Sequence, residues 1–178
     1  MRAALLAEGL RLVESAGVEA ISLREVARGV GVSPTSVYRH FPDKQALMEA
    51  IASEALARLG EAQAVAARES GQAKAFNAVG RAYVQFALAH PGLFRVAYTY
   101  PGIAVRDPTS EATASILRDL ALDLAGGEEA RARLIGLRAW SFVHGLAMLM
   151  LDGRVPADPK LIDAAIDSAA IDFGGPPG

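Results

Sequence analysis

The chain has 178 residues and a net charge of −2 at pH 7, and 52% of its residues are hydrophobic. It contains no cysteine, which excludes disulfides, thiol sensors and zinc–cysteine sites. The N-terminus lacks the regions of a signal peptide, and no stretch of about 18 residues is free of charge, so we expect a cytoplasmic protein without a membrane span. Aromatic residues make up only 6%, so the core must consist mostly of Ala, Leu, Val and Ile, which favours helices.

The first two predicted helices are delimited by local signals. The first spans about Arg2–Ala16 and ends at Gly17. The second begins after Ser22, which has Glu25 three residues later in the capping-box pattern. Gly31 ends this helix, because a sharp turn there favours a residue that tolerates a positive φ.

A third, short helix follows the turn. Ser33 can cap it and Pro34 suits its first position. Val37 and Phe41 lie four residues apart and are expected to face the core. The side chains left on the outside are Thr35, Ser36, Tyr38, Arg39 and His40. This spacing fits a helix-turn-helix, whose second helix enters the major groove of DNA.

The remaining chain is predicted to form helices, and no alternating strand pattern competes with them. The expected helices span about 44–67, 73–89, 93–97, 107–126, 128–151 and 159–171. Asp43 caps the first of these, His90-Pro91-Gly92 breaks the second, and Tyr98 to Arg106 is expected to be a loop. The result is an all-α protein of about nine helices. We expect a helix-turn-helix DNA-binding domain at 1–45, a helical ligand-binding and dimerisation domain at 46–173, and a disordered tail at 174–178.

This order of features resembles the TetR (tetracycline-repressor-like) family of bacterial transcriptional regulators. The resemblance is carried by Gly17, Ser22, Leu23, Val26, Ala27, Gly31, Val32, Ser33, Val37, Tyr38, His40, Phe41, Lys44 and Leu47. In the C-terminal half, Trp140-x-x-x-His144-Gly145 resembles the WHG type of TetR C-terminal domain. Three helices in the DNA-binding module and six behind it also agree with this family, which implies a regulator that needs no cofactor.

The predicted DNA-contacting residues are Ser22, Arg24, Thr35, Ser36, Tyr38, Arg39, His40 and Lys44. The resemblance implies phosphate contacts for Tyr38, His40 and Lys44, and contacts to base edges or nearby sugar-phosphate for Thr35 and Ser36. Ordinary packing between helices stays open for Tyr38, as does a solvated surface charge for Arg39. Residues 1–50 carry six basic and six acidic side chains, so we expect only modest non-specific DNA affinity.

The predicted ligand-contacting residues are Phe86, Phe94, Tyr98, Trp140 and His144, to which Tyr83 could be added. Trp140 and His144 are four residues apart and therefore share one helix face. An apolar cavity with a few polar groups is typical of ligand sites. A helical core without a ligand would show the same residues, so a buried, hydrogen-bonded His144 is the competing interpretation. The three histidines are too scattered to predict a metal site.

The last two helices have apolar faces wider than one buried stripe requires. Two such helices from each of two chains would form a four-helix bundle. A homodimer would also let two recognition helices meet successive major grooves about 34 Å apart. Alternatively, both helices complete the core of a monomer.

These features favour a ligand-responsive repressor. A homodimer would bind a near-palindromic operator on double-stranded DNA, and a small, mostly apolar ligand would change the separation of its DNA-binding modules. An enzyme that uses His144 with Asp152 or Asp123 is the first alternative, but no nucleophile elbow, phosphate loop or HExxH motif supports it. The second alternative is a helical adaptor whose DNA module no longer binds DNA.

Overall fold

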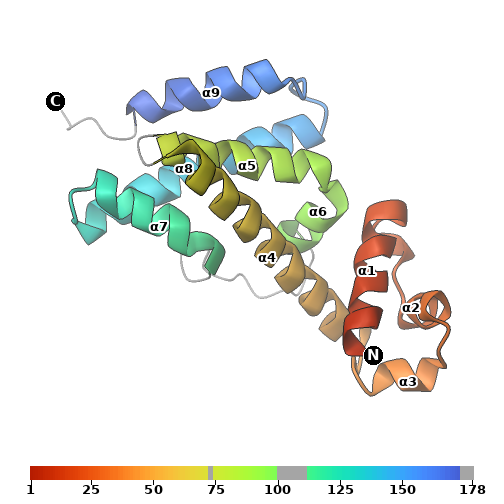
Figure 1. Ribbon diagram of the computed structural model, residues 1–178. Coiled ribbons are helices and arrows are strands. Elements are labelled where there is room, and N and C mark those ends of the chain that lie inside the picture. The colour runs from red at the N-terminus through yellow and green to blue at the C-terminus, as the bar shows by residue number, and fades with distance from the viewer. Residues whose placement is uncertain (72–73, 100–111, 173–178) are drawn as a thin grey trace. The chain divides into compact units, whose positions relative to one another are not determined.

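The computed structural model describes residues 1–71, 74–99 and 112–172. Within these residues the chain forms nine α-helices and one short 3-10 helix, with no strand, which confirms the expected all-α fold (Figure 1). The α-helices are α1 (Arg2–Ala16), α2 (Leu23–Val30), α3 (Pro34–Tyr38), α4 (Lys44–Ser70), α5 (Ala75–Ala89), α6 (Pro91–Thr99), α7 (Ala112–Leu124), α8 (Glu129–Leu151) and α9 (Pro159–Asp172). The 3-10 helix η1 (Val18–Ala20) was not expected from the sequence.

The helices form two compact units. The first comprises Met1–Leu56 together with α6, and the second contains the rest of α4 with α5, α7, α8 and α9. Helix α4 therefore contributes to both units. Helix α6 belongs to the same unit as α1, α2 and α3, although α4 and α5 lie between them in the sequence. The functional boundary expected after residue 45 stays a prediction.

Local capping fixes the helices of the first unit. The Oγ atom of Ser22 accepts a hydrogen bond from the Glu25 N–H at 3.1 Å, and that of Ser33 accepts one from the Ser36 N–H at 3.3 Å. Gly31 adopts φ 75° and ψ 32°, the left-handed conformation that the turn requires. The three predicted signals are therefore confirmed, and they place α3 directly after the turn.

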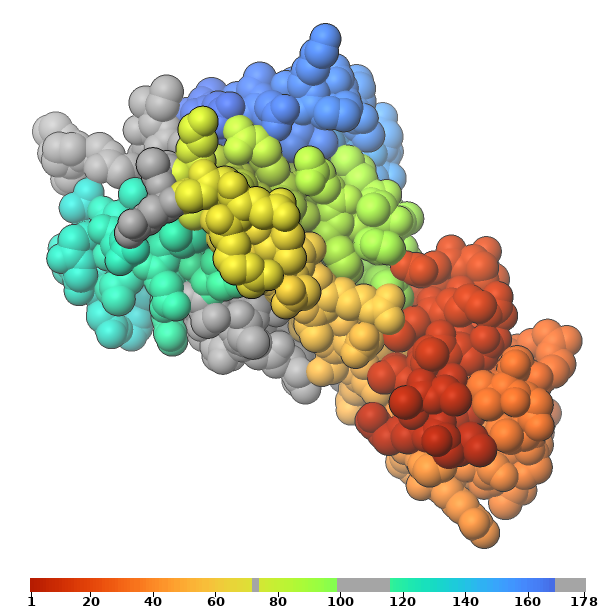
Figure 2. Space-filling view, viewed as in Figure 1, coloured from red at the N-terminus to blue at the C-terminus, as the bar shows by residue number. Residues whose placement is uncertain are grey.

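One hydrophobic core unites this first unit, whose space-filling surface is drawn in red to orange for α1, α2 and α3 (Figure 2). Its buried residues include Leu5, Leu10, Val13, Val26, Ala27, Val37, Phe41, Leu47, Ile51, Leu93 and Val96. Val37 and Phe41 are both buried, as the four-residue spacing predicted. Because α3 has only five residues, its stability depends on this packing and not on its own length.

Helix α6 lies close against α1. A Cβ atom added to Gly92 would lie 2.7 Å from the carbonyl oxygen of Val13, so only glycine permits this approach. Nδ1 of His90 lies 2.5 Å from Oε1 of Glu14 on α1. The expected break at His90-Pro91-Gly92 is thus a helix boundary: Pro91 begins α6, because proline needs no hydrogen-bond acceptor at a first helical position.

The loop expected from Tyr98 to Arg106 was wrong at its start. Tyr98 and Thr99 complete the last turn of α6, which packs on α1. Residues 100–106 lie outside the described residues. So do the Asp107-Pro108 start expected for α7 and the tail predicted at 174–178.

We predict that Gly92→Ala lowers the free energy of unfolding by about 1–3 kcal/mol, because a backbone oxygen must move to admit the new methyl group. Urea unfolding followed by circular dichroism measures this change. Gly136→Ala is the matched control, since a Cβ at Gly136 meets no atom within 4 Å. There the better helix propensity of alanine is expected to stabilise by up to about 1 kcal/mol. Equal effects of the two substitutions would contradict the close α1–α6 contact.

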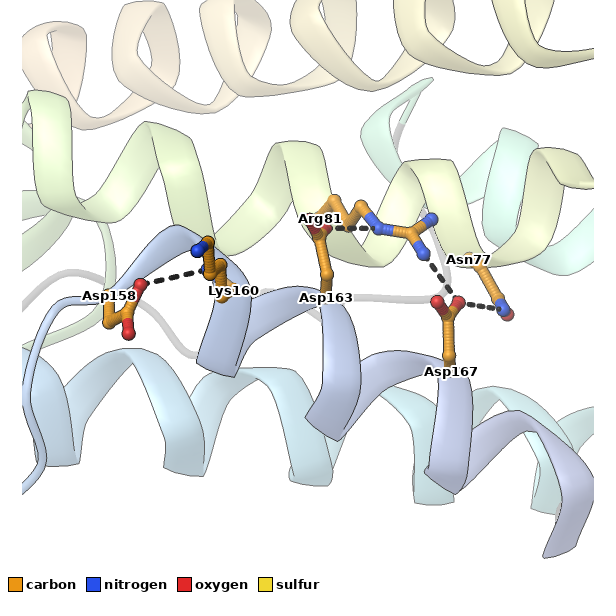
Figure 3. A network of polar contacts seen from close by, with 6 residues as sticks. All are labelled: Asn77, Arg81, Asp158, Lys160, Asp163 and Asp167. Carbon is orange, nitrogen blue, oxygen red and sulfur yellow. Dashed lines mark hydrogen bonds and ion pairs between the residues drawn. The ribbon is translucent and has the colours of Figure 1, made fainter.

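In the second unit, α7, α8 and α9 all pack against α5. The side chain of Gln63, in the C-terminal part of α4, is buried and donates to the carbonyl of Val79 at 3.4 Å. A polar network joins α5 to α9 (Figure 3). In it Nε of Arg81 donates to Oδ1 of Asp163 at 2.7 Å, and Arg81 also binds Asp167. Asn77 donates to Asp167 at 3.0 Å, and the hydrogen bonds from Asn77 and Arg81 lower the pKa of this carboxyl.

Among the described helices, α8 alone is long and apolar enough to cross a membrane by length and composition. One such helix is weak evidence for a membrane span, because the core helix of a soluble protein passes the same test of length and hydropathy. Helix α8 buries Ile135, Ala139, Val143 and Ala147 in the packed second unit. It begins at Glu129 and ends at Leu151, close to the predicted bounds.

Candidate DNA-binding face and effector site

The outer side of α3 and the turn that follows it carry five of the predicted DNA-contacting residues. Tyr38 is 51% exposed, Thr35 and Arg39 are exposed, and His40 is partly exposed. Val37 lies beneath them and is fully buried. The core therefore holds one side of α3 and leaves a polar and aromatic surface on the other, as the sequence predicted.

Two serines of the predicted DNA-contacting set, Ser22 and Ser36, also have structural roles. Ser22 caps α2. Oγ of Ser36 lies 2.9 Å from Oγ of Ser33, the residue that caps α3. The hydroxyls of Ser22 and Ser36 are therefore already engaged with the starts of their helices. Their substitution would change helix stability as well as any DNA contact.

Two basic residues of the set stand at helix starts. Arg24 is exposed in the first turn of α2. Lys44 is the first residue of α4, and Oδ1 of Asp43 caps that helix by accepting from the Ala46 N–H at 2.7 Å. Helix starts present unpaired N–H groups, so both cations lie where phosphate binding is favourable.

Arg2 is a residue that sequence reasoning did not include. Its guanidinium lies over the ring of Phe41, 5.0 Å from the ring centre. This contact places a cation beside the segment that contains His40 and Lys44. No sequence spacing relates Arg2 to Phe41, so only the tertiary contact could reveal it.

The predicted ligand-contacting residues are divided between the two units. Phe94 and Tyr98 lie on α6 in the first unit, with ring centres 4.9 Å apart, and Phe94 is buried. Phe86, Trp140 and His144 belong to the second unit. The five residues therefore do not form one cluster within a single unit.

In the second unit, His144 joins α8 to α5. Nδ1 of His144 lies 2.9 Å from the hydroxyl of Tyr83, which is almost fully buried. The ring centre of Trp140 lies 5.4 Å from that of His144. Burial lowers the pKa of His144 below its ordinary value. A neutral imidazole offers one donor and one acceptor, so this group suits an uncharged polar contact beside aromatic surface.

This pKa shift predicts a pH dependence of stability. Between the folded and unfolded pKa values the unfolded chain binds more protons, so stability is present above the ordinary histidine pKa and falls as pH falls. We expect the free energy of unfolding of the unaltered protein to drop more between about pH 7.5 and about pH 5 than that of His144→Gln. Urea titrations at both pH values measure the difference.

Tyr83→Phe is the control for this experiment. It removes the hydroxyl near Nδ1 but keeps the buried ring, and burial is the cause of the pKa shift. The variant should therefore retain the pH dependence. An identical pH dependence in His144→Gln and the unaltered protein would contradict the prediction.

The structure does not support the catalytic alternatives. Nδ1 of His144 is engaged with the Tyr83 hydroxyl, while Asp152 is exposed just past the end of α8. Within the described part of the chain, no group of three or more His, Cys, Asp or Glu side chains could hold a metal ion.

Two family models match the chain. The model described as bacterial regulatory proteins, tetR family, matches residues 5–51, and the model described as tetracyclin repressor-like, C-terminal domain, matches residues 76–170. The second match covers just over half of the chain. The chain belongs to the TetR family. The predicted family is therefore confirmed, and the likeness of its C-terminal half to the WHG type stays a resemblance.

Similar proteins agree with this assignment. The uncharacterised HTH-type transcriptional regulator YobS of Bacillus subtilis (strain 168) is 26% identical over 155 residues, which are 86% of this chain and 80% of that protein. A protein of unknown function from Rhodococcus sp. RHA1 has a solved structure that matches with a TM-score of 0.75 and 33% identity, over 97% of this chain and 92% of that one.

A third similar structure contains a ligand. A single-substitution variant of TetR from Acinetobacter baumannii AYE, in complex with minocycline, matches with a TM-score of 0.68 over 97% of this chain and 93% of that one. At 16% identity this likeness shows the fold alone. As a TetR-family member, the chain is a DNA-binding transcriptional regulator and not an enzyme. The Acinetobacter protein itself binds minocycline in that structure.

Proposed function

We propose that this protein is a repressor, released from a near-palindromic operator by a small, mostly apolar ligand. The observation that carries the proposal is the exposed surface of α3, with Tyr38 half exposed above the buried Val37. A short helix held by the core on one side and polar on the other suits insertion into a major groove.

The proposed DNA contacts are those that the resemblance to the TetR family implies. Tyr38, His40 and Lys44 would bind phosphates, and Thr35 would reach base edges. Arg2, held over Phe41, is added as a further phosphate contact. The other proposed contacts are Ser22, Arg24, Ser36 and Arg39.

The proposed effector site centres on His144, Trp140 and Phe86 in the second unit. The hydrogen bond of His144 to Tyr83 adds Tyr83 to the proposed site. Phe94 and Tyr98 are proposed as a second ligand-contacting group on α6. A ligand that prefers one separation of the DNA-binding modules by about 1–3 kcal/mol would suffice for release.

The proposed regulator is a cytoplasmic homodimer, joined through α8 and α9. Support comes from large apolar side chains that are exposed on both helices. They are Leu134, Leu137 and Leu149 on α8, and Leu161 on α9. The proposed functional domains are a DNA-binding domain at 1–45 and a ligand-binding and dimerisation domain at 46–173.

Selection from a pool of random DNA duplexes of about 40 base pairs, long enough for two half-sites, tests the proposal. Enrichment of an inverted repeat is the expected result and would supply the operator for a screen of small apolar ligands. No enrichment at low salt, from protein with a normal helical spectrum, would contradict the proposal and favour the adaptor alternative.

A further inference from the structure

Gln63 is a polar side chain in the apolar core of the second unit. Among the described residues it is the only polar or charged side chain, tyrosine apart, that is buried, and it is 4% exposed. Its amide donates to the carbonyl of Val79 at 3.4 Å, beyond the usual range of about 2.7–3.2 Å. A buried amide held by so long a hydrogen bond destabilises the fold relative to an apolar side chain of similar size. The fold alone therefore gives no reason for a glutamine at this position.

Gln63 meets α5 at a turn that carries a second polar group. Val79 and Tyr83 are four residues apart on one face of α5, and in a helix the Val79 carbonyl accepts the N–H of Tyr83. The Tyr83 hydroxyl lies 2.9 Å from Nδ1 of His144 on α8. Helices α4, α5 and α8 thus each bring one polar side chain to this turn. We call Gln63, Tyr83 and His144 the polar strip.

Aromatic surface borders the polar strip. The ring centres of Trp140 and His144 are 5.4 Å apart, and the two ring planes are inclined by 35°. Both residues are only partly buried, so a molecule from solvent can reach them. Such a surface can bind a flat apolar molecule by stacking, and the donors and acceptors beside it can fix the orientation of that molecule.

The polar strip presents no charge to a ligand at neutral pH. An amide and a phenol are neutral there, and burial lowers the pKa of His144, so its imidazole is neutral as well. Arg81 is the only charged side chain of α5, and it is held by Asp163 and Asp167 of α9 (Figure 3). An ionised ligand would lose hydration at the strip without gaining a counter-charge. The strip therefore favours an uncharged ligand.

We propose that the effector is an uncharged aromatic molecule that carries a hydroxyl or carbonyl group. Its ring stacks on Trp140, and its polar group binds Gln63 and the pair formed by Tyr83 and His144. Gln63 then exchanges its long hydrogen bond to Val79 for one to the ligand. The inference rests on the ligand response of the proposed function and names the chemical class of that ligand.

Four probes with one ring system test this class. They are naphthalene, β-naphthol, β-naphthoate and β-naphthylmethylammonium, which present no polar group, a hydroxyl, an anion and a cation. Isothermal titration calorimetry of the unaltered protein at about pH 7.5 measures each affinity. We expect β-naphthol to bind at least about tenfold more tightly than either ion, because only the ions lose a charge's hydration. Tightest binding of an ion, or no binding of any probe at about 1 mM, would overturn the proposal.

Gln63→Leu tests the role of the amide. The variant should bind β-naphthol at least about fivefold more weakly and naphthalene as well as before, because it loses only a hydrogen bond. Its midpoint of urea unfolding should stay the same or rise, since the Val79 carbonyl keeps its helical partner. A glutamine with a purely structural role would instead lower that midpoint. Gln85→Leu makes the same change at an exposed position of α5 and should alter neither affinity.

The outcomes separate the effector class from the proposed function. An enriched operator together with no preference for β-naphthol, or with equal β-naphthol affinities for Gln63→Leu and the unaltered protein, would overturn the class and leave the repressor intact. Selective β-naphthol binding without any enriched operator would support the class and contradict the repressor. Selective binding that also weakens operator binding, measured by fluorescence anisotropy, would support both.

Discussion

Tyr38→Ala is expected to weaken operator binding by roughly 30- to 1000-fold while leaving the fold intact. Loss of one contact per half-site costs about 1–2 kcal/mol, and a dimer loses it twice. Tyr38 is half exposed, so its truncation should change the free energy of unfolding by no more than about 0.5 kcal/mol. Fluorescence anisotropy with the selected operator measures the affinity, and urea unfolding measures the stability.

Arg28→Ala is the control for Tyr38→Ala. Arg28 is exposed on α2 and pairs with Glu25 on the same helix, outside the proposed contact set. We expect its replacement to change operator affinity by less than about threefold, through long-range charge alone. Unchanged binding by Tyr38→Ala, with the operator otherwise bound specifically, would show that α3 does not read the DNA in the proposed way.

The hydroxyl and the ring of Tyr38 can be separated. Tyr38→Phe keeps an aromatic edge for thymine methyl groups and removes the hydrogen bond to phosphate. If the phosphate contact dominates, Tyr38→Phe should resemble Tyr38→Ala and weaken binding equally to all sequences. The measurement is the affinity for the operator and for an unrelated duplex at matched salt.

Phe41→Ala is expected to have the largest effect on stability, about 3–5 kcal/mol. The ring is almost fully buried in the core that holds α3, and the Arg2 guanidinium lies over it. The variant should lose operator binding at temperatures where the second unit is still helical. Calorimetry and operator affinity measured on the same sample would show both losses.

Two further variants separate the contributions to the expected loss of stability in Phe41→Ala. Phe41→Leu retains most of the apolar volume and should cost less than about 1.5 kcal/mol if the cavity is the main cause. Arg2→Ala removes the cation over the ring and should cost about 0.5–1 kcal/mol of stability. A Phe41→Ala variant with normal stability would contradict the position of Phe41 in the core.

Some features of this protein follow from short sequence windows. Ser22, Ser33 and Asp43 cap helices within three residues of themselves, and Gly31 supplies a backbone angle that other residues rarely adopt. Such contacts depend on neighbours in the chain, so pattern alone could predict the helices, the turn and the exposed side of α3.

Other features required the folded chain. Arg2 meets Phe41, Tyr83 meets His144, and Arg81 meets Asp163 across sequence separations that no helical periodicity relates. The same reason explains why α6 joined the first unit and divided the predicted ligand-contacting residues. Local capping and periodic burial were sufficient to predict the all-α fold and the helix-turn-helix, whereas the family was predicted from the resemblance of the sequence to known regulators. Which helices share a core was evident only after folding, because long-range packing depends on the combined shape of many side chains.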